Sequence, residues 1–274
     1  MHLRRILTGL ALVPIFLFGI LWPYGAWFTA LVTFLFFLGG RRELYRILSV
    51  NPTWALAWFQ GLVAAGFFVG AVLQWWPALA LFFFAFFWGS CLITLYHGHE
   101  ASRRAISGHV LVALYLMVPL AGFGLLRSLP NGDAFLYFLL AVTCMTDVGA
   151  LYGGKLLGRK PLAPVLSPNK TWEGAAAGLL SALIFIWVSA YVDVQFSGEA
   201  LWIENRPWLL ELTLLTILVS SAGQVGDLCE SALKRDLGIK DSGDTITGHG
   251  GYLDMMDGAL WIAPATLIYA LFFT

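Results

Sequence analysis

The sequence predicts an all-α, polytopic integral membrane protein with about nine transmembrane helices. Only 12% of the 274 residues are charged and 59% are hydrophobic, whereas a soluble domain carries roughly 25% charged residues. Apolar runs near the length of about 20 residues that a bilayer-spanning helix needs recur along the whole chain. Lysine and arginine gather on one side of these runs, as the positive-inside rule requires.

The nine predicted spans follow one another through short connections. They run approximately over residues 6–22, 24–39, 54–73, 78–96, 106–126, 134–152, 174–192, 208–226 and 258–273. The first span lacks a small-x-small exit and further spans follow it, so we expect no cleavable signal peptide. We divide the chain into an N-terminal group of about five spans (1–133) and a C-terminal region of about four spans (134–274) that carries the polar motifs.

The charges predict an orientation. With nine spans, fourteen of the 16 lysines and arginines lie on one side, and only Arg127 and Arg206 lie on the other. This places the N-terminus in the cytoplasm and the C-terminus outside, in an inner (plasma) membrane, with every motif facing the cytoplasm. We expect Arg41, Arg42, Arg103 and Arg104 to serve mainly this topology, because no other polar residues converge on them. The formal net charge of zero gives no sign of nucleic-acid binding.

Glycine pairs predict where helices pack closely. The spacing of Gly66 with Gly70, and of Gly174 with Gly178, lets two backbones approach each other in lipid. We therefore interpret both pairs as helix contacts.

The first polar motif begins at Asp147, near the end of the sixth predicted span. An ionisable residue there is functional by default because burying charge in lipid is costly, although a helix-end residue that reaches water is the alternative. The glycine-rich segment that follows ends in Lys155 and approaches a P-loop. However, Leu156 occupies the Ser/Thr position and no strand precedes it, which excludes a P-loop NTPase. We expect a glycine-rich turn whose lysine can approach phosphates.

The second polar motif is Ser167–Gly174, SPNKTWEG. Serine followed by proline predicts a helix start, with Ser167 as N-cap and Pro168 as the first helical residue. The free N–H groups of such a start, together with Lys170, favour an anion.

The third polar motif is Gly226–Asp257. Four of its residues have the i, i+3, i+4, i+7 spacing that puts them on one helix face: Asp227, Glu230, Ser231 and Lys234. Asp254 and Asp257 are three residues apart, so a second helix turn would present two carboxylates on one side. Carboxylates hold hard cations, and lysine and arginine bind phosphates. The motif therefore indicates metal-assisted chemistry on phosphates.

The order of residues in the third motif closely resembles the signature of phosphatidate cytidylyltransferases (CDP-diacylglycerol synthases). The matching residues are Ser231, Lys234, Arg235, Lys240, Asp241, Gly243, His249, Gly250, Gly251, Asp254 and Asp257. The second motif resembles a Ser-Pro-x-Lys-Thr-x-Glu-Gly block of the same family. The N-terminal half matches only as generic membrane spans. Thr247, Tyr252 and Met255 depart from the family pattern, and Met255 stands where the family has an arginine.

The resemblance implies a membrane nucleotidyltransferase of phospholipid biosynthesis, with residues 134–274 as its catalytic region. It would condense CTP with phosphatidate to give CDP-diacylglycerol and pyrophosphate. The phosphatidate phosphate is itself the nucleophile and is largely ionised at pH 7, so neither a serine nucleophile nor a strong general base is required. Catalysis would then rest on positioning and electrostatics.

Roles for individual residues follow as expectations. The catalytic candidates are Asp227, Asp254, Lys234 and His249. The candidate ligands of Mg²⁺, with room for a second cation, are Asp227, Asp254, Asp257, Glu230 and Asp147. The candidate substrate-binding residues are Ser167, Asn169, Lys170, Thr171, Glu173, Arg235, Lys240 and Asp241. The expected partners are CTP, phosphatidate and the bilayer, and a homodimer is one option for the assembly.

Two alternatives stay open. One is a related transferase that acts on a different lipid phosphate; the Asp-Gly-x-x-Ala-Arg pattern of CDP-alcohol phosphotransferases is absent from this sequence. The other is a non-enzymatic transporter or scaffold. Transporters place their binding sites near the middle of the membrane, whereas the motifs here are predicted to lie at one face.

Overall fold

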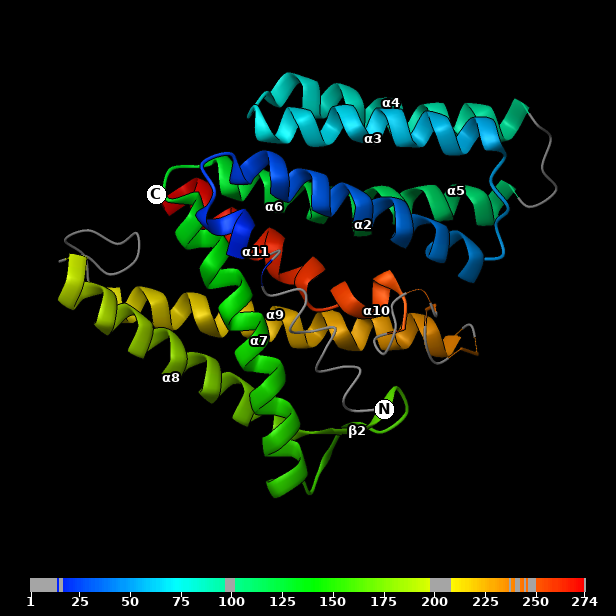
Figure 1. Cartoon of the computed structure of the whole chain (residues 1–274). Helices are drawn as coiled ribbons and strands as arrows, with labels where there is room; N and C mark the ends of the chain where they lie inside the picture. Colours follow the sequence, from blue (N-terminus) through cyan, green and yellow to red (C-terminus); the bar gives the residue numbers. More distant parts are fainter. Residues whose placement is uncertain are drawn as a thin grey trace. The chain divides into compact units, whose positions relative to one another are not determined.

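The computed structural model describes residues 14, 17–96, 102–197, 208–236, 238–239, 242–243, 245 and 250–273. These residues are mostly helical (Figure 1). The chain divides into two compact units, each of which is treated by itself. Unit 1 comprises Met1–Pro130 and Leu237–Met256, and unit 2 comprises Asn131–Asp236 and Asp257–Thr274.

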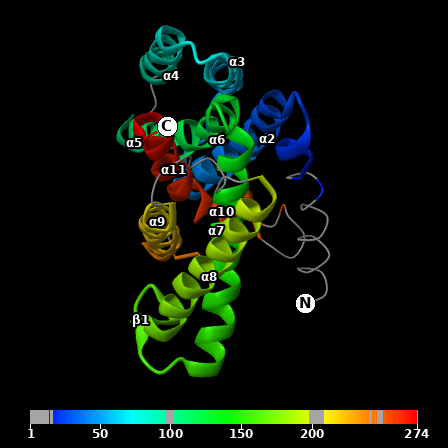
Figure 2. The ribbon, with the colours of Figure 1, turned by 90° about the vertical axis from the view of Figure 1, so that its left-hand side faces the viewer.

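Unit 1 is helical throughout its described elements. These are α2 (Gly25–Ile47), α3 (Trp54–Val72), α4 (Trp76–Tyr96), α5 (Ser102–Leu111), the π-helical η1 (Val112–Met117), α6 (Val118–Ser128) and the short α10 (Tyr252–Met256). Helix α3 begins where the Thr53 hydroxyl accepts the Leu56 N–H at 3.3 Å, which is an N-cap. Helices α3 and α4 pack as a hairpin (Figure 2). A Cβ on Gly66 would lie 2.5 Å from the Phe82 ring, so the predicted close contact at this glycine is confirmed.

Buried polar side chains connect four helices of unit 1. The Gln60 amide of α3 donates to the Tyr45 hydroxyl of α2 at 2.7 Å and to Ser90 of α4 at 2.9 Å. The His109 ring of α5 bonds the same tyrosine hydroxyl at 2.7 Å. Arg41 is also buried and donates to the Ala57 carbonyl at 2.8 Å. The expectation that Arg41 serves mainly topology is therefore wrong, because its guanidinium ties α2 to α3 inside the protein.

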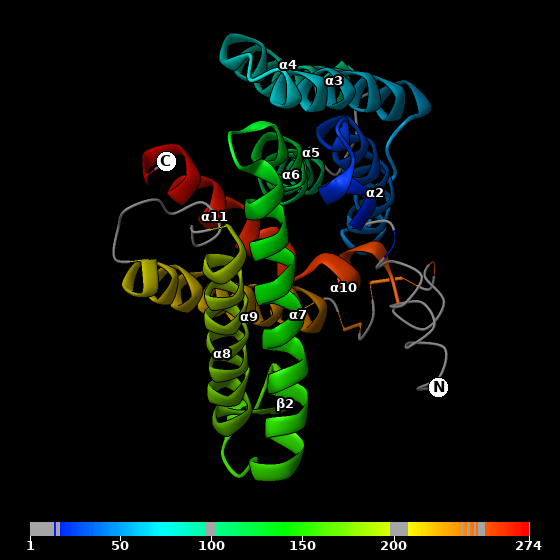
Figure 3. The same ribbon diagram turned by 60° about the vertical axis from the view of Figure 1, so that its left-hand side comes forward.

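Unit 2 combines long helices with one small antiparallel hairpin. Its described elements are α7 (Gly132–Leu157), β1 (Pro161–Ala163), β2 (Ser167–Thr171), α8 (Trp172–Ser197), α9 (Trp208–Asp236) and α11 (Ala259–Phe273). Helices α7 and α8 lie side by side (Figures 1 and 3). A Cβ on Gly178 of α8 would lie 2.7 Å from the Thr146 carbonyl of α7. The backbones are thus too close for any side chain there, as the glycine spacing predicts.

Seven segments of the described residues are long and apolar enough to cross a membrane. They are Trp54–Val72, Trp76–Tyr96, Arg104–Ser128, Gly132–Leu157, Trp172–Phe196, Leu209–Arg235 and Tyr252–Phe272. Each coincides with one of the predicted spans, so the polytopic all-α class is confirmed. The predicted span 24–39 lies in α2, which is helical but is not among the seven. The predicted span 6–22 falls largely outside the described residues. The number nine and the orientation of the termini stay predictions.

Two local expectations about helix ends are wrong. Ser167 does not cap a helix, because Ser167–Thr171 forms strand β2 and α8 begins at Trp172. The cap is Thr171, whose hydroxyl accepts the Gly174 N–H at 3.1 Å. The glycine-rich segment before Lys155 is not a turn either, since α7 continues to Leu157. Asp147 therefore lies roughly 15 Å before the end of its helix, at 1.5 Å per residue.

Candidate active site

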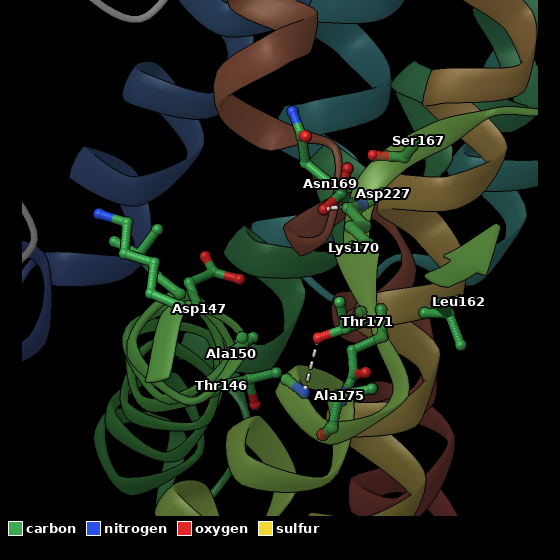
Figure 4. A pocket seen from close by; sticks show the side chains of 16 residues that line it. Thr146, Asp147, Ala150, Leu162, Ser167, Asn169, Lys170, Thr171, Ala175 and Asp227 are labelled. Carbon is green, nitrogen blue, oxygen red and sulfur yellow. Dashed lines mark hydrogen bonds and ion pairs between the residues drawn. The ribbon is translucent and has the colours of Figure 1, made fainter. Parts of the chain in front are cut away.

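A pocket of about 790 Å³ opens within unit 2 (Figure 4). Strand β2 contributes Ser167, Asn169, Lys170 and Thr171, helix α7 contributes Asp147, and helix α9 contributes Asp227. The structure thus brings six of the predicted site residues to one cavity. They come from all three polar motifs of the sequence, which lie far apart along the chain.

The ammonium of Lys170 forms an ion pair with the Asp227 carboxylate inside this pocket (Figure 4). Both side chains are about one-third exposed, at 29% and 35%. The Lys170 nitrogen itself is buried in the pair, so the exposed part of its side chain is the aliphatic stem. Asp147 lies across the pocket on α7, close enough for the charges of both Asp227 and Lys170 to act on it.

The hairpin that carries Lys170 is fixed at its base by backbone hydrogen bonds. The Glu173 carboxylate accepts the N–H groups of Arg159 at 3.0 Å and Lys160 at 3.2 Å. The Trp172 N–H donates to the Lys160 carbonyl at 3.0 Å. Glu173 was predicted to bind substrate, but its carboxylate holds the start of α8 to the segment before β1 and does not line the pocket.

Helix α9 is held against the other walls of the pocket by polar contacts. The Gln224 amide donates to the Ala175 carbonyl of α8 at 3.2 Å, and Ser220 bonds Thr146 of α7 at 2.8 Å. At its C-terminal end, Arg235 donates to the Leu166 carbonyl at 3.3 Å. Arg235, predicted to bind substrate, thus contacts the loop between the strands. Asp227 belongs to the same helix as these contacts, so its position depends on this packing.

The helical face predicted from Asp227 to Lys234 exists in α9. Glu230 is buried, with 2% exposure, and forms an i, i+4 ion pair with Lys234. Neither residue lines the pocket. The two charges compensate each other inside the protein, which lowers the cost of burying either one.

Carboxylates gather around Asp227 within unit 2. Asp257 lies close enough to Asp227, Glu230 and Asp147 for the charge of each to act on it. In the described part of the chain, no three His, Cys, Asp or Glu side chains converge into a ready-made metal site. Mg²⁺ usually takes only one or two protein carboxylates together with substrate phosphates. The residues present therefore fit a cation that binds together with a phosphate substrate.

Asp254 has a different setting, in unit 1. Its Oδ2 accepts the N–H groups of Ser242 and Gly251, both at 2.8 Å, and the Ser242 hydroxyl at 2.9 Å. Helix α10 ends at Met256, and Asp257 lies in the turn after it. Of the two carboxylates predicted to share one helix turn, only Asp254 lies within α10.

Three predicted site residues, Lys240, Asp241 and His249, lie outside the described residues. The pocket also contains residues that were not assigned to the site. Lys155 and Gln224 both line it. The position of Lys155 fits the expectation that this lysine can approach phosphates. Gln224 lies three residues before Asp227 on the same helix face, and that spacing could have identified it.

This chain is similar to known proteins of one family. The model of the cytidylyltransferase family matches residues 3–273. A phosphatidate cytidylyltransferase of Staphylococcus saprophyticus is 41% identical over 135 residues, which cover 49% of this chain and 48% of the relative. One from Bacillus subtilis is 38% identical over 155 residues (56% and 54%), and one from Brucella suis is 33% identical over 214 residues (76% and 63%). The chain thus spans about half to under two-thirds of the length of these relatives.

Proposed function

Since the chain belongs to the cytidylyltransferase family, we propose that it condenses CTP with phosphatidate to give CDP-diacylglycerol and pyrophosphate. The similar proteins described above carry the name of this activity. A protein whose described residues include seven segments able to cross a membrane has direct access to a lipid substrate. The reaction belongs to phospholipid biosynthesis.

The observation that carries this proposal is the ion pair of Lys170 with Asp227 in the pocket. It joins a cation suited to phosphate with a carboxylate suited to a metal ion, and each comes from a different family motif. A substrate phosphate that enters the pocket would meet the lysine. The hydroxyls of Ser167 and Thr171 and the amide of Asn169 line the same cavity and are donors for phosphate oxygens.

The reaction is a displacement at phosphorus. An oxygen of the phosphatidate phosphate attacks the α-phosphorus of CTP, a new P–O bond forms, and the bond to the β-phosphate breaks to release pyrophosphate. The attacking phosphate is largely ionised at pH 7. The protein therefore needs to position two anions against each other and to compensate their charge. Lys170 supplies positive charge for this purpose, and the packing of α9 fixes the position of Asp227.

The family resemblance implies a metal ion, and we propose Mg²⁺. Asp227 would hold it, with Asp257, Glu230 and Asp147 nearby and Asp254 as a further ligand candidate. When bound, the ion would compensate the negative charge of the phosphates. Lys240, Asp241 and His249 stay proposed contributors to phosphate binding, and Lys234 acts through its ion pair with Glu230.

The charge distribution supports a cytoplasmic site. CTP is a cytoplasmic solute, and fourteen of the 16 Lys and Arg lie on the side that we assign to the cytoplasm. We propose the inner (plasma) membrane as the location.

Purified protein, labelled CTP and phosphatidate test the proposal, with Mg²⁺ or with a chelator. We expect CDP-diacylglycerol and pyrophosphate in equal amounts and only with Mg²⁺. Turnover of another lipid phosphate in preference to phosphatidate would favour the related-transferase alternative. No product with any lipid phosphate would favour a transporter or scaffold.

A further inference from the structure

A buried carboxylate of unit 1, Glu43, lies outside all three sequence motifs. It belongs to α2 and is 5% exposed. Three donors from one distant part of the chain point at its two oxygens. The Ser242 hydroxyl and the Leu253 N–H each reach Oε2 at 3.1 Å, and the Thr245 hydroxyl reaches Oε1 at 3.3 Å. Charged acceptors make the stronger hydrogen bonds of proteins.

Ser242 is fixed by two elements of unit 1. Its carbonyl accepts from Arg46 of α2 at 2.8 Å, and its N–H donates to Asp254 of α10 at 2.8 Å. Its hydroxyl lies within hydrogen-bond distance of both Glu43 and Asp254. A hydroxyl has a single proton to donate, so Glu43 and Asp254 share this donor. The orientation of the Asp254 carboxylate is therefore tied to α2 through one serine.

Two glycines of the third motif lie directly against Glu43. A Cβ on Gly243 would lie 2.6 Å from Oε1, and a Cβ on Gly251 would lie 2.4 Å from Oε2. Real Cβ atoms do not approach oxygen this closely. The glycines are thus required because their backbone passes directly over a buried carboxylate. That carboxylate accepts hydrogen bonds from two hydroxyls and one backbone N–H of the same part of the chain.

We propose that Glu43 is a positioning residue for the reaction: it holds Ser242 and the start of α10, and through them sets the orientation of Asp254. It does not contact substrate. The expected effect of Glu43 on kcat rests on the proposed function. The expected effect of Glu43 on the order of the Gly250–Leu253 backbone does not depend on activity.

The test compares Glu43→Gln with Glu43→Asp in the full-length protein in detergent. Glutamine keeps the shape of the side chain but replaces one acceptor oxygen with an NH₂ group, which cannot accept the hydrogen bonds that reach this position. Aspartate keeps both acceptor oxygens. Hydrogen exchange of the Gly250–Leu253 backbone is measured together with kcat and KM for CTP and phosphatidate. We expect Glu43→Gln to raise exchange at least tenfold and to lower kcat at least tenfold, with both KM values within about threefold. Glu43→Asp keeps the charge but draws both oxygens back by one methylene, so it should recover only part of the kcat.

Glu211→Gln is the matched control, since Glu211 is a carboxylate of unit 2 that accepts the Tyr269 hydroxyl. It should leave exchange at Gly250–Leu253 unchanged. Should Glu43→Gln fail to fold, Thr245→Val removes a single donor to Glu43 and should raise exchange by about two- to fivefold. Unchanged exchange in the folded variants would overturn the proposal. Raised exchange with unchanged kcat would reduce Glu43 to a structural contact and overturn its positioning role.

The two proposals fail in distinguishable ways. A wild-type protein that makes no CDP-diacylglycerol would refute the proposed function and, with it, the catalytic part of the Glu43 proposal. The exchange measurement would still decide whether Glu43 holds the segment.

Discussion

Lys170 of strand β2 and Asp227 of helix α9 form an ion pair at the wall of one pocket. The two residues belong to two separate motifs, and their pairing turns these motifs into one site. A lysine so close to a carboxylate compensates its charge when no phosphate is present. The nitrogen of the same lysine is buried in this pair, so we expect it to turn from the carboxylate toward a phosphate that enters the pocket.

The first prediction concerns Lys170. Lys170→Ala should lower kcat/KM by roughly 10- to 100-fold, since a hydrogen bond to a charged group contributes about 1.5–3 kcal/mol and each 1.36 kcal/mol is a factor of ten. Steady-state kinetics with varied CTP and varied phosphatidate measure the change. Lys160→Ala is the control, because it removes the same charge from an exposed residue that does not line the pocket. Equal kinetics for both variants would show that Lys170 does not bind a substrate phosphate.

The second prediction concerns the contact between α7 and α8. A Cβ on Gly149 would lie 2.0 Å from the Ser181 hydroxyl and 2.8 Å from the Ala177 carbonyl. Overpacking costs about 1–3 kcal/mol, so Gly149→Leu should lower the Tm in detergent by roughly 3–8 °C. Thermal unfolding followed by fluorescence measures this. Gly61→Ala, where the nearest atom would be 3.9 Å away, should shift the Tm by less than about 1 °C. A stable Gly149→Leu variant would mean that the two backbones are not in contact.

The third prediction concerns topology. In a variant without Cys91, Cys144 and Cys229, a cysteine placed within 193–206 should react with an impermeant thiol reagent added outside the cell. A cysteine within 236–248 should not react until the membrane is permeabilised. The reason is the charge distribution of the loops. The reverse labelling pattern would contradict both the orientation and the cytoplasmic CTP site.

The spans were predictable because hydrophobic length is a local property of the sequence. Each of the seven segments able to cross a membrane that the described part of the chain contains coincides with a predicted span. Ser167 was mispredicted because Ser-Pro is a helix-start signal, whereas pairing of β2 with β1 decides the structure there. Helix α8 then begins four residues beyond the expected first helical residue, at the Thr171 cap.

The motifs indicated which residues gather in the pocket, but not how they pair. Ion pairing of Lys170 with Asp227 depends on the packing of α9 against α8, which residue spacing does not contain. Glu43 was not predictable, since its partner Ser242 is 199 residues away in the sequence. Tyr252 departs from the family pattern. Its ring lies against Gly39 of α2, in the space that a side chain at position 39 would occupy. Such long-range compensation becomes visible only in three dimensions.

Asp227 and Asp254 test most directly the claim that this protein forms CDP-diacylglycerol with the help of Mg²⁺ held by carboxylates. Asp227→Asn and Asp254→Asn each keep the shape of the side chain and remove one charge. We predict that each abolishes Mg²⁺-dependent formation of CDP-diacylglycerol at normal expression, and that the double variant is little worse than either single variant, because residues that act as one unit are not additive. The measurement is release of labelled pyrophosphate from CTP in the presence of phosphatidate. Near-normal turnover in both single variants would contradict the claim, and the metal role would then pass to Asp147, Glu230 or Asp257.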